Sequence, residues 1–288
     1  MSLGLNKTKR RIASIRSTQK ITKAMGMVAA VKLRRFRDLV DKGEEYAKGL
    51  YEVMGELLLH DNETHTHYSS ENEDDLGTLY IVVTSNLGLC AGYNNNIFKY
   101  LESFVDPSKD IICPLGEKGR AHYLHDDRYH NVDLDLPRVD KTLSPKQIDA
   151  LCLNLKKAFN EKRVRKVVLV YTHYVNSISF VPEQETLLPL QIETTPREDE
   201  SYCPPLFEPS ARAQIHSLLP YYLGSRIYYR IAESQLCEQA SRRNAMDNAN
   251  DNADELLSKL TIEYNKARQT AITQEIVEVV SGSANATN

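Results

Sequence analysis

The 288-residue sequence predicts a mixed α and β protein, in which long N- and C-terminal helices form an antiparallel coiled coil beside a central α/β domain. Two observations predict this. All eleven prolines lie between Pro107 and Pro220, and proline breaks helix interiors. Apolar residues also follow a helical period at both ends of the chain. The expected boundaries are 1–59 for the first helix, 60–75 for a linker, 76–207 for the α/β domain and 208–288 for the second helix.

The first helix is predicted from apolar residues that recur every three or four positions. The stripe consists of Ile12, Ile15, Ile21, Ala24, Met25, Val28 and Val31, and it continues through Phe36, Leu39, Val40, Ala47, Leu50, Val53, Met54 and Leu57. A lone helix would leave this stripe in water, so we expect a second helix to cover it. The acidic stretch that follows, HDNETHTHYSSENEDD, has no apolar period and predicts a flexible linker over 60–75.

The middle of the chain alternates between strand and helix patterns. Apolar runs predict strands at 79–84, 111–113 and 167–171, and a hairpin from 180–181 and 188–192. Helices are expected over 94–105 and after Ser144, a residue suited to capping a helix. This alternation favours a Rossmann-like mixed sheet covered by helices.

The second terminal helix is predicted from the stretch between Ser225 and Ser281, 57 residues without glycine or proline. As one helix it would be about 85 Å long. Its apolar stripe consists of Leu256, Leu257, Leu260, Tyr264, Ala267 and Ala271, and Ser281-Gly282 is expected to end it. Such length is typical of a coiled coil, and two helices that leave the same domain would pair antiparallel.

The residues indicate no catalytic chemistry. The turn from Thr84 to Asn94 carries Gly88 and Gly92 after a strand, but it lacks the spacing and the lysine of a Walker loop. No dinucleotide fingerprint, nucleophile motif or paired carboxylates appear. The five cysteines lie far apart without a C-x-x-C, which favours a reducing compartment over disulfides or zinc. We therefore expect no catalytic residue, cofactor, metal or small-molecule substrate.

Charge is the strongest functional signal. Residues 1–37 carry eleven Lys or Arg and no Asp or Glu, although the whole chain has a net charge of −3. A segment this basic needs an acidic partner. Nucleic acid, an acidic protein surface and the acidic stretch 233–278 of the chain itself all fit. No apolar run is long enough for a membrane span, and the opening MSLGLNKTKRR predicts no secretory signal.

Three segments are similar to those of one known family. They are KRRIASIRSTQKITKAMGMVAAVKLRR, TSNLGLCAGYNNNIFK and AMDNANDNADELLSKLTIEYNKARQTAITQEIVEVVSG. Their order and spacing also agree with that family. The chain thus resembles the gamma subunit of the F-type rotary ATP synthase. It departs from the usual family pattern at Asn86-Leu87, Ala91 and Gly26.

The resemblance implies a rotor shaft inside a ring of alpha and beta subunits. Its α/β domain would sit with the epsilon subunit on the membrane c ring, so that ion flow drives ATP synthesis or hydrolysis at the beta subunits. The chain itself would be a non-catalytic subunit. The expected location is peripheral, at the cytoplasmic face of a bacterial cell membrane, with an organellar inner membrane less favoured.

The resemblance also assigns roles to particular residues. Met25, Arg268 and Gln269 match positions that contact the beta subunit, and Phe207 and Glu208 match a stretch near the c ring. The basic bearing surface would be formed by Lys9, Arg10, Arg16, Lys20 and Lys23.

Two other classes of function remain open at this stage. One is a nucleic-acid-binding coiled coil based on the basic helix, and the other is a nucleotide-binding enzyme based on the Gly88–Gly92 turn. Co-purification with alpha and beta subunits, without nucleic acid, would separate both from a rotor.

Overall fold

The computed structural model describes residues 2–61, 68–73, 75–126, 128–129, 144–192 and 205–286. The chain divides into two compact units, which we describe separately. The coiled-coil unit comprises Met1–Ala30 and Arg242–Asn288, and the α/β unit comprises Val31–Ser241. Among the residues described, no helix has a stretch both long and apolar enough to cross a membrane.

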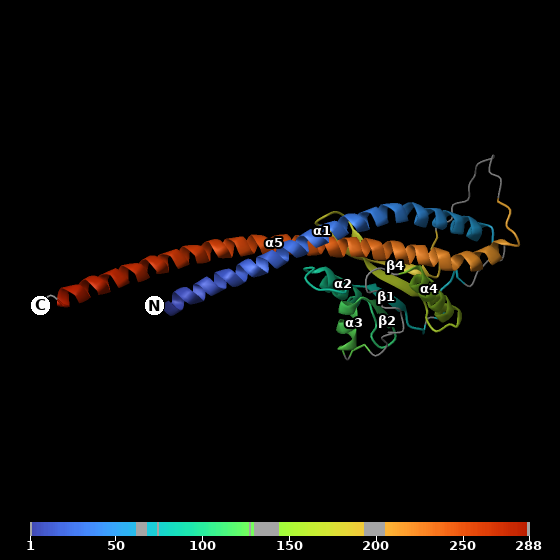
Figure 1. Ribbon diagram of the computed structural model, residues 1–288. Helices are drawn as coiled ribbons and strands as arrows, with labels where there is room; N and C mark the ends of the chain where they lie inside the picture. The colour runs from blue at the N-terminus through green and yellow to red at the C-terminus, as the bar shows by residue number, and fades with distance from the viewer. Residues whose placement is uncertain are drawn as a thin grey trace. The chain divides into compact units, whose positions relative to one another are not determined.

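Two long helices contribute to both units (Figure 1). Helix α1 spans Ser2–Leu59 and helix α5 spans Ala211–Ala286. The prediction that α5 ends at Ser281-Gly282 is wrong, because the helix continues through both residues. Glycine lowers helix stability by only about 1 kcal/mol relative to alanine, so it does not force an end. Pro220 lies inside α5, where the buried Leu219 and Leu223 hold the helix in the core.

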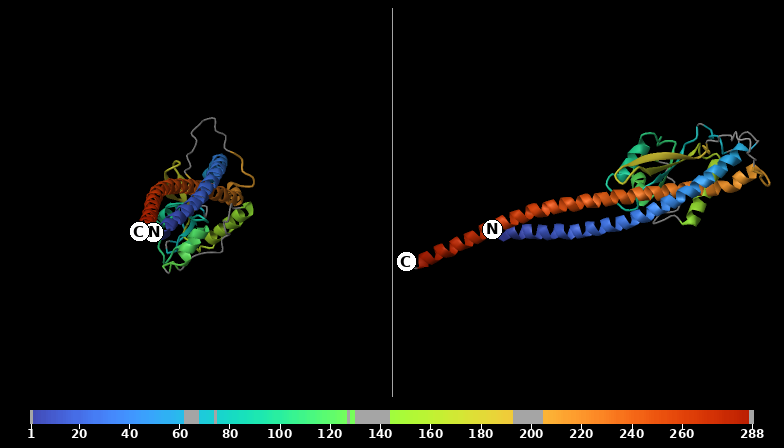
Figure 2. Two further views of the ribbon diagram at one scale, coloured as in Figure 1. Left: turned by 60° about the vertical axis from the view of Figure 1, so that its left-hand side comes forward. Right: turned by 90° about the horizontal axis from the view of Figure 1, so that it is seen from above.

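The two helices are antiparallel within the coiled-coil unit, as predicted (Figure 2). Gln19 Nε2 donates to Asp254 Oδ1 at 2.7 Å, and Thr22 Oγ1 donates to Asn250 Oδ1 at 2.5 Å. Further along α1, a Cβ added to Gly26 would lie 3.5 Å from the Cβ of Met246. The partner number falls as the α1 number rises, so the chain directions are opposite.

The α/β unit contains one four-stranded sheet of order β2-β1-β3-β4. Its strands are β1 Leu79–Val83, β2 Ile111–Leu115, β3 Val167–Tyr174 and β4 Phe180–Leu188. Strand β1 pairs in parallel with β2 and β3, whereas β4 pairs antiparallel with β3. The predicted hairpin exists, but β3 and β4 form it. Residues 188–192 are not its second strand, because Pro189 follows Leu188 and cannot donate to a ladder.

Three shorter helices cover this sheet. They are α2 Tyr93–Glu102, α3 Glu117–Leu124 and α4 Pro145–Asn160. Ser144 caps α4 as predicted, in a capping box with Gln147. Helix α3 was not predicted, because its sequence EKGRAHYL has almost no apolar period and contains a glycine.

The sheet is buried on both faces. One face packs against α2 and α3 through Ile97, Leu101 and Tyr123. The other packs against α4 and the parts of α1 and α5 in this unit, including Met54, Leu151 and Leu223. Strands with both faces covered read as continuous apolar runs, which is why the sequence revealed them.

The predicted flexible linker is only partly testable, since residues 62–67 and 74 lie outside the described residues. Residues 69–71 and 73 are exposed, but Tyr68 and Asn72 hold this stretch against the α/β unit. Tyr68 is buried in the core, and Asn72 Nδ2 donates to the carbonyl oxygens of Phe159 and Val164, both at 2.9 Å. Arg165 forms an ion pair with Glu71. The acidic composition hid these anchoring residues.

Candidate functional site

The seam of the coiled-coil unit is more polar than the predicted apolar stripe. The α1 residues that face α5 there are Ile12, Ile15, Gln19, Thr22, Gly26 and Ala29, spaced by three or four. Gln19 is 9% exposed, and Gln19 and Thr22 donate the two hydrogen bonds to α5 described above. Polar residues in such a seam fix the register at some cost in stability. The sequence analysis missed them because it searched for apolar residues.

Several apolar residues of the predicted stripe lie on the outside instead. Ile21 is 60% exposed and Val28 is 55% exposed, and Ala24 is exposed beside them. On α5, Leu256 is 45% exposed, whereas Leu260 is buried as predicted. The coiled-coil unit therefore presents large apolar side chains to its surroundings, which is typical of a surface that meets a partner.

The predicted basic surface is exposed along one end of α1. Its residues Lys9, Arg10, Arg16, Lys20 and Lys23 are all exposed. Within the described side chains, none of these five forms an ion pair. Two acidic residues of α5 in this unit have other partners: Asp254 accepts from Gln19, and Glu255 pairs with Lys259 at 2.5 Å. The basic charge is therefore available to an acidic partner rather than neutralised within the unit.

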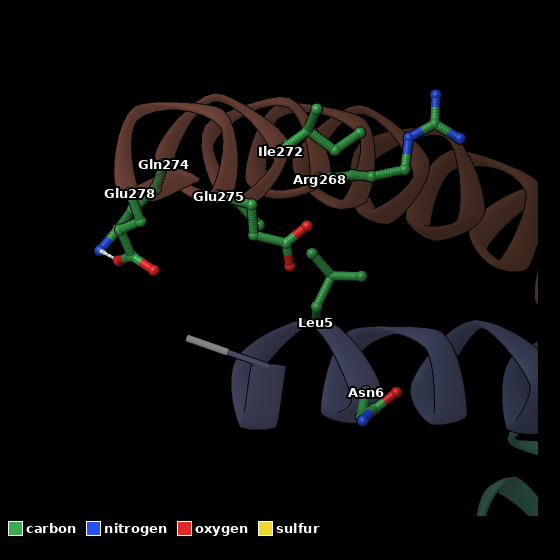
Figure 3. Close-up of a pocket in the computed structure, with 8 residues that line it drawn as sticks. Leu5, Asn6, Arg268, Ile272, Gln274, Glu275 and Glu278 are labelled. Atoms are coloured by element: carbon green, nitrogen blue, oxygen red, sulfur yellow. Dashed lines mark hydrogen bonds between the residues drawn. The ribbon is translucent and has the colours of Figure 1, made fainter. Parts of the chain in front are cut away.

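Arg268 and Gln269 lie on α5 near the beginning of α1, and both are exposed. Arg268 lines an open cavity of about 420 Å³ together with Leu5 and Asn6 of α1 and Glu275 of α5. Figure 3 shows Leu5 and the Glu275 carboxylate pointing toward each other, while the Arg268 guanidinium extends away from α1. The N–H donors of the Arg268 side chain therefore point away from the α1–α5 helix pair (Figure 3).

The structure does not bring Met25 together with Arg268. Met25 is half-buried and lies beside Gly26, which faces Met246. Met246 and Arg268 are 22 residues apart on α5, or about 33 Å along the helix. The sequence-predicted residues therefore form two separate contact regions within the coiled-coil unit.

Phe207 and Glu208 lie just before α5, in the α/β unit. Phe207 is half-buried, and its ring centroid lies 5.6 Å from that of His60 at the end of α1. Glu208 is exposed, and its carbonyl accepts from Gln214 Nε2 at 2.6 Å. Leu206, which the sequence analysis did not single out, is completely exposed beside them. Leu206 directly follows Pro204 and Pro205, and this apolar residue in a proline-bearing segment was the sequence signal that could have revealed it.

Four polar residues on α5 fasten it to the sheet of the α/β unit, and we call Arg230, Glu233, Ser234 and Ser241 the α5 anchor. The Glu233 side chain is 4% exposed. Its Oε1 contacts His173 Nδ1 at 2.5 Å and accepts from the Tyr174 amide, while its Oε2 accepts from Arg230 at 2.9 Å. This carboxylate is therefore paired and hydrogen-bonded, as burial requires.

Arg230 connects the α5 anchor to the edge strand. Its Nε donates to Glu185 Oε2 of β4 at 2.6 Å, and Arg226 Nε donates to the other oxygen of Glu185 at 2.5 Å. The Arg230 guanidinium also lies 4.6 Å from the centroid of the Tyr171 ring. Burial raises the pKa of the Tyr171 phenol, so this ring stays neutral.

The glycine-bearing turn after β1 docks on the same helix. Tyr93 OH and Ser234 Oγ are 2.8 Å apart, and Ser241 Oγ donates to the Cys90 carbonyl at 2.7 Å. Burial raises the pKa of Tyr93 well above its usual range. The turn thus has a structural role that its sequence, which resembles a phosphate loop only loosely, did not reveal.

Inside this turn, polar groups bind one another. Asn94 Oδ1 accepts from the Ser85 amide at 3.0 Å, and Asn94 Nδ2 donates to Ser85 Oγ at 2.7 Å. Ser85 Oγ in turn donates to the Leu87 carbonyl at 2.8 Å. The turn is closed by its own side chains, so these groups are not directed at a ligand.

Together, the two units define a coiled-coil interaction protein whose basic, partly apolar helix pair is accompanied by a mixed α/β unit. The ATP synthase family model matches residues 4–286. ATP synthase gamma chains of Mesoplasma florum and Heliobacterium modesticaldum are 37% and 35% identical, over 97% and 98% of each chain. The chain therefore belongs to the ATP synthase gamma chain family.

Solved structures share the fold. A chain of the Euglena gracilis mitochondrial ATP synthase rotor matches with a TM-score of 0.67 at 17% identity, over 94% of this chain and all of that one. A chain from the central stalk and c-ring structure of the Tetrahymena thermophila mitochondrial ATP synthase matches with a TM-score of 0.56 at 24% identity, over 80% and 99%.

Proposed function

We propose that the chain is the central rotor shaft of an F-type ATP synthase, which couples ion flow through a membrane c ring to ATP synthesis or hydrolysis at beta subunits. The observation that carries this proposal is the contrast along α5. One part of the helix is fastened to the sheet by the buried α5 anchor. Another part has a mostly exposed surface and buries few side chains against α1. A shaft that transmits torque needs a fixed end and a surface that can turn.

The α5 anchor supplies the fixed end. Torque on the α/β unit would reach α5 through two backbone segments. Glu233 and Ser234 accept from the Tyr174 and Thr172 amides of β3, and Ser241 donates to the Cys90 carbonyl in the turn after β1. A buried carboxylate held by an arginine and an amide resists displacement, because separating them exposes an uncompensated charge. Rotation of the α/β unit would therefore turn α5 with it.

The coiled-coil unit supplies the turning surface. We propose that Met25, Arg268 and Gln269 contact the beta subunit, and that Lys9, Arg10, Arg16, Lys20 and Lys23 face acidic loops of the alpha and beta ring. Exposed charge pairs contribute only about 0–1 kcal/mol each, because water and salt screen them. Contacts this weak can form and break repeatedly, which suits a bearing.

The α/β unit would meet the remaining partners. We propose that Phe207 and Glu208 lie near the c ring and that the epsilon subunit binds this unit as well. The complex would be peripheral, at the cytoplasmic face of a bacterial membrane. The chain would have no catalytic site or cofactor of its own, in agreement with a Gly88–Gly92 turn that is closed by its own side chains.

Co-expression with alpha and beta subunits tests the proposal. We expect the chain to purify with both at a ratio of one copy per ring of three alpha and three beta subunits, free of nucleic acid, and to be needed for coupled ATP turnover. Intact-mass measurement gives the ratio, and absorbance at 260 nm reports nucleic acid. Retention of nucleic acid without alpha and beta subunits would favour the nucleic-acid-binding alternative and overturn the rotor.

A further inference from the structure

Three side chains that bind metals gather where two helices of the α/β unit end. Glu102 is the last residue of α2, His122 lies in the last turn of α3, and Asp126 follows two residues after α3 ends. One ligand atom from each lies within 4.8 Å of the others. None of the three takes part in the α5 anchor or the coiled-coil surface.

The ligands are attached to well-packed backbone. Leu101, next to Glu102, and Tyr123, next to His122, are completely buried in one hydrophobic cluster. The His122 ring stacks on Phe98 with centroids 4.0 Å apart and planes inclined by 5°. Packing that fixes the plane of a histidine ring prepares it to bind a metal, because less freedom is lost on binding.

The spacing of His122 and Glu102 suits zinc. His122 Nε2 and Glu102 Oε1 are 3.3 Å apart, and the ligands of a tetrahedral zinc ion with bonds of about 2.0–2.1 Å are separated by about 3.3–3.4 Å. One imidazole and two carboxylates form a nitrogen–oxygen donor set that zinc accepts, whereas Mg²⁺ favours oxygen ligands and water. The side chains of His122 and Glu102 are 33% and 30% exposed, so an ion can reach them.

A cationic side chain already lies at this position. Arg128 Nη2 is 3.3 Å from Glu102 Oε1 and 2.5 Å from Asp126 Oδ2, and Arg128 Nε donates to Asp126 Oδ1 at 2.9 Å. The Arg128 side chain is 59% exposed, so water can hydrate it once it leaves the carboxylates. The two carboxylates are thus arranged around a positive charge that is replaceable.

We propose that Glu102, His122 and Asp126 form a zinc site and that Arg128 is the competing cation that occupies it when the metal is absent. Bound zinc would tie the end of α2 to the end of α3 and stabilise this part of the α/β unit. The proposal is independent of the rotor function. No sequence motif marks the site, because its ligands are separated by 20 and 4 residues and meet only in the fold.

Zinc titration of the metal-stripped full-length chain tests the site. Calorimetry should show one site of micromolar affinity, and cobalt used as a probe should give the visible absorption of tetrahedral nitrogen–oxygen coordination. Glu102→Gln and His122→Gln should each weaken binding by at least about tenfold. Arg128→Gln should strengthen it, because it removes the competing charge. His125→Gln is the matched control, since it changes an exposed histidine three residues away and should leave binding unchanged.

The comparison of zinc affinities among these variants shows whether zinc binds at this site. Zinc binding by the wild-type chain alone does not show this, because the chain has seven other histidines and five cysteines that could bind zinc elsewhere. Circular dichroism checks that each variant is folded, and Glu102→Gln preserves the size of a partly exposed side chain. Equal affinity in wild type, Glu102→Gln and His122→Gln would overturn the proposal, as would a wild-type chain that binds no zinc. Weaker zinc binding by Arg128→Gln than by the wild-type chain would contradict the proposal that Arg128 competes with zinc for the site.

Discussion

The α/β unit and the coiled-coil unit use the same helices in opposite ways. In the α/β unit, α5 buries Leu219, Leu223 and Ile227 completely and fastens a buried carboxylate, Glu233, to the sheet. In the coiled-coil unit, the same helix has few buried residues and meets α1 through polar bonds such as that of Gln19 to Asp254. The difference teaches that one continuous helix can be a core element in one part and an exposed surface in another.

Matched leucine truncations on α5 should give the largest difference between the units. Leu223→Ala should lower the free energy of unfolding by about 2–5 kcal/mol, because it leaves a cavity in a packed core. Leu257→Ala removes a half-buried side chain in the coiled-coil unit and should cost about 1 kcal/mol. Urea denaturation followed by circular dichroism measures both. Equal losses would show that the two units are packed alike.

Removing a carboxylate from each unit sharpens the comparison. Glu233→Ala should cost about 3 kcal/mol, because it leaves Arg230 and the Tyr174 amide without their buried partner. Asp254→Ala should cost only about 1 kcal/mol, since Gln19 Nε2 keeps the Asn250 carbonyl as a second acceptor at 3.5 Å. Thermal unfolding of the two variants, side by side, makes the test. A larger loss from Asp254→Ala would contradict our view of the seam as the weaker contact.

The sequence predicted most of the fold for physical reasons that differ between the units. In the α/β unit, strands buried on both faces form apolar runs that are visible without a structure. The long helices follow from their period and from the absence of proline. The true seam could not be predicted, because Gln19 and Thr22 pack inward while the more apolar Ile21 and Val28 face outward. The choice of face depends on how α1 packs against α5, which the apolar period alone does not show.

The candidate site was predictable only in part. The family resemblance placed Met25, Arg268 and Gln269 on the coiled coil. The structure leaves the side chains of Arg268 and Gln269 exposed there, and their contact with a beta subunit stays a prediction. The α5 anchor escaped notice because serine and glutamate on a helix look like solvated residues. Their burial arises only when α5 packs on β3, which is a property of the whole chain.

Substitution of Arg268 should change function while leaving stability almost unaltered. Arg268→Leu should impair coupled ATP turnover of the assembled complex, because a hydrogen bond from arginine to a charged group contributes about 1.5–3 kcal/mol. Gln269→Leu should impair it less, since its bonds are neutral. Lys266→Leu, an exposed cation two residues earlier, is the control. Unchanged turnover in an assembled Arg268→Leu complex would mean that this surface contacts nothing.

The smallest expected effect concerns nucleotide. The purified chain should neither bind ATP at micromolar concentration nor hydrolyse it, because Ser85 and Asn94 satisfy each other within the turn after β1. Equilibrium dialysis with labelled ATP measures this. Stoichiometric binding that is lost in Gly88→Ala would show that the turn is a ligand site, and the α/β unit would then have a chemical role.

Rotation of the α/β unit is the most direct test of the account. The described cysteines are buried, so a Cys203→Ser, Leu153→Cys chain offers one exposed thiol on α4. We would label it with a visible probe, assemble the chain with surface-fixed alpha and beta subunits and follow the probe under a microscope. The account predicts that the probe turns in one direction when ATP is added and stops when ATP is removed. A probe that stays still while the complex hydrolyses ATP would contradict the claim that the chain is the shaft.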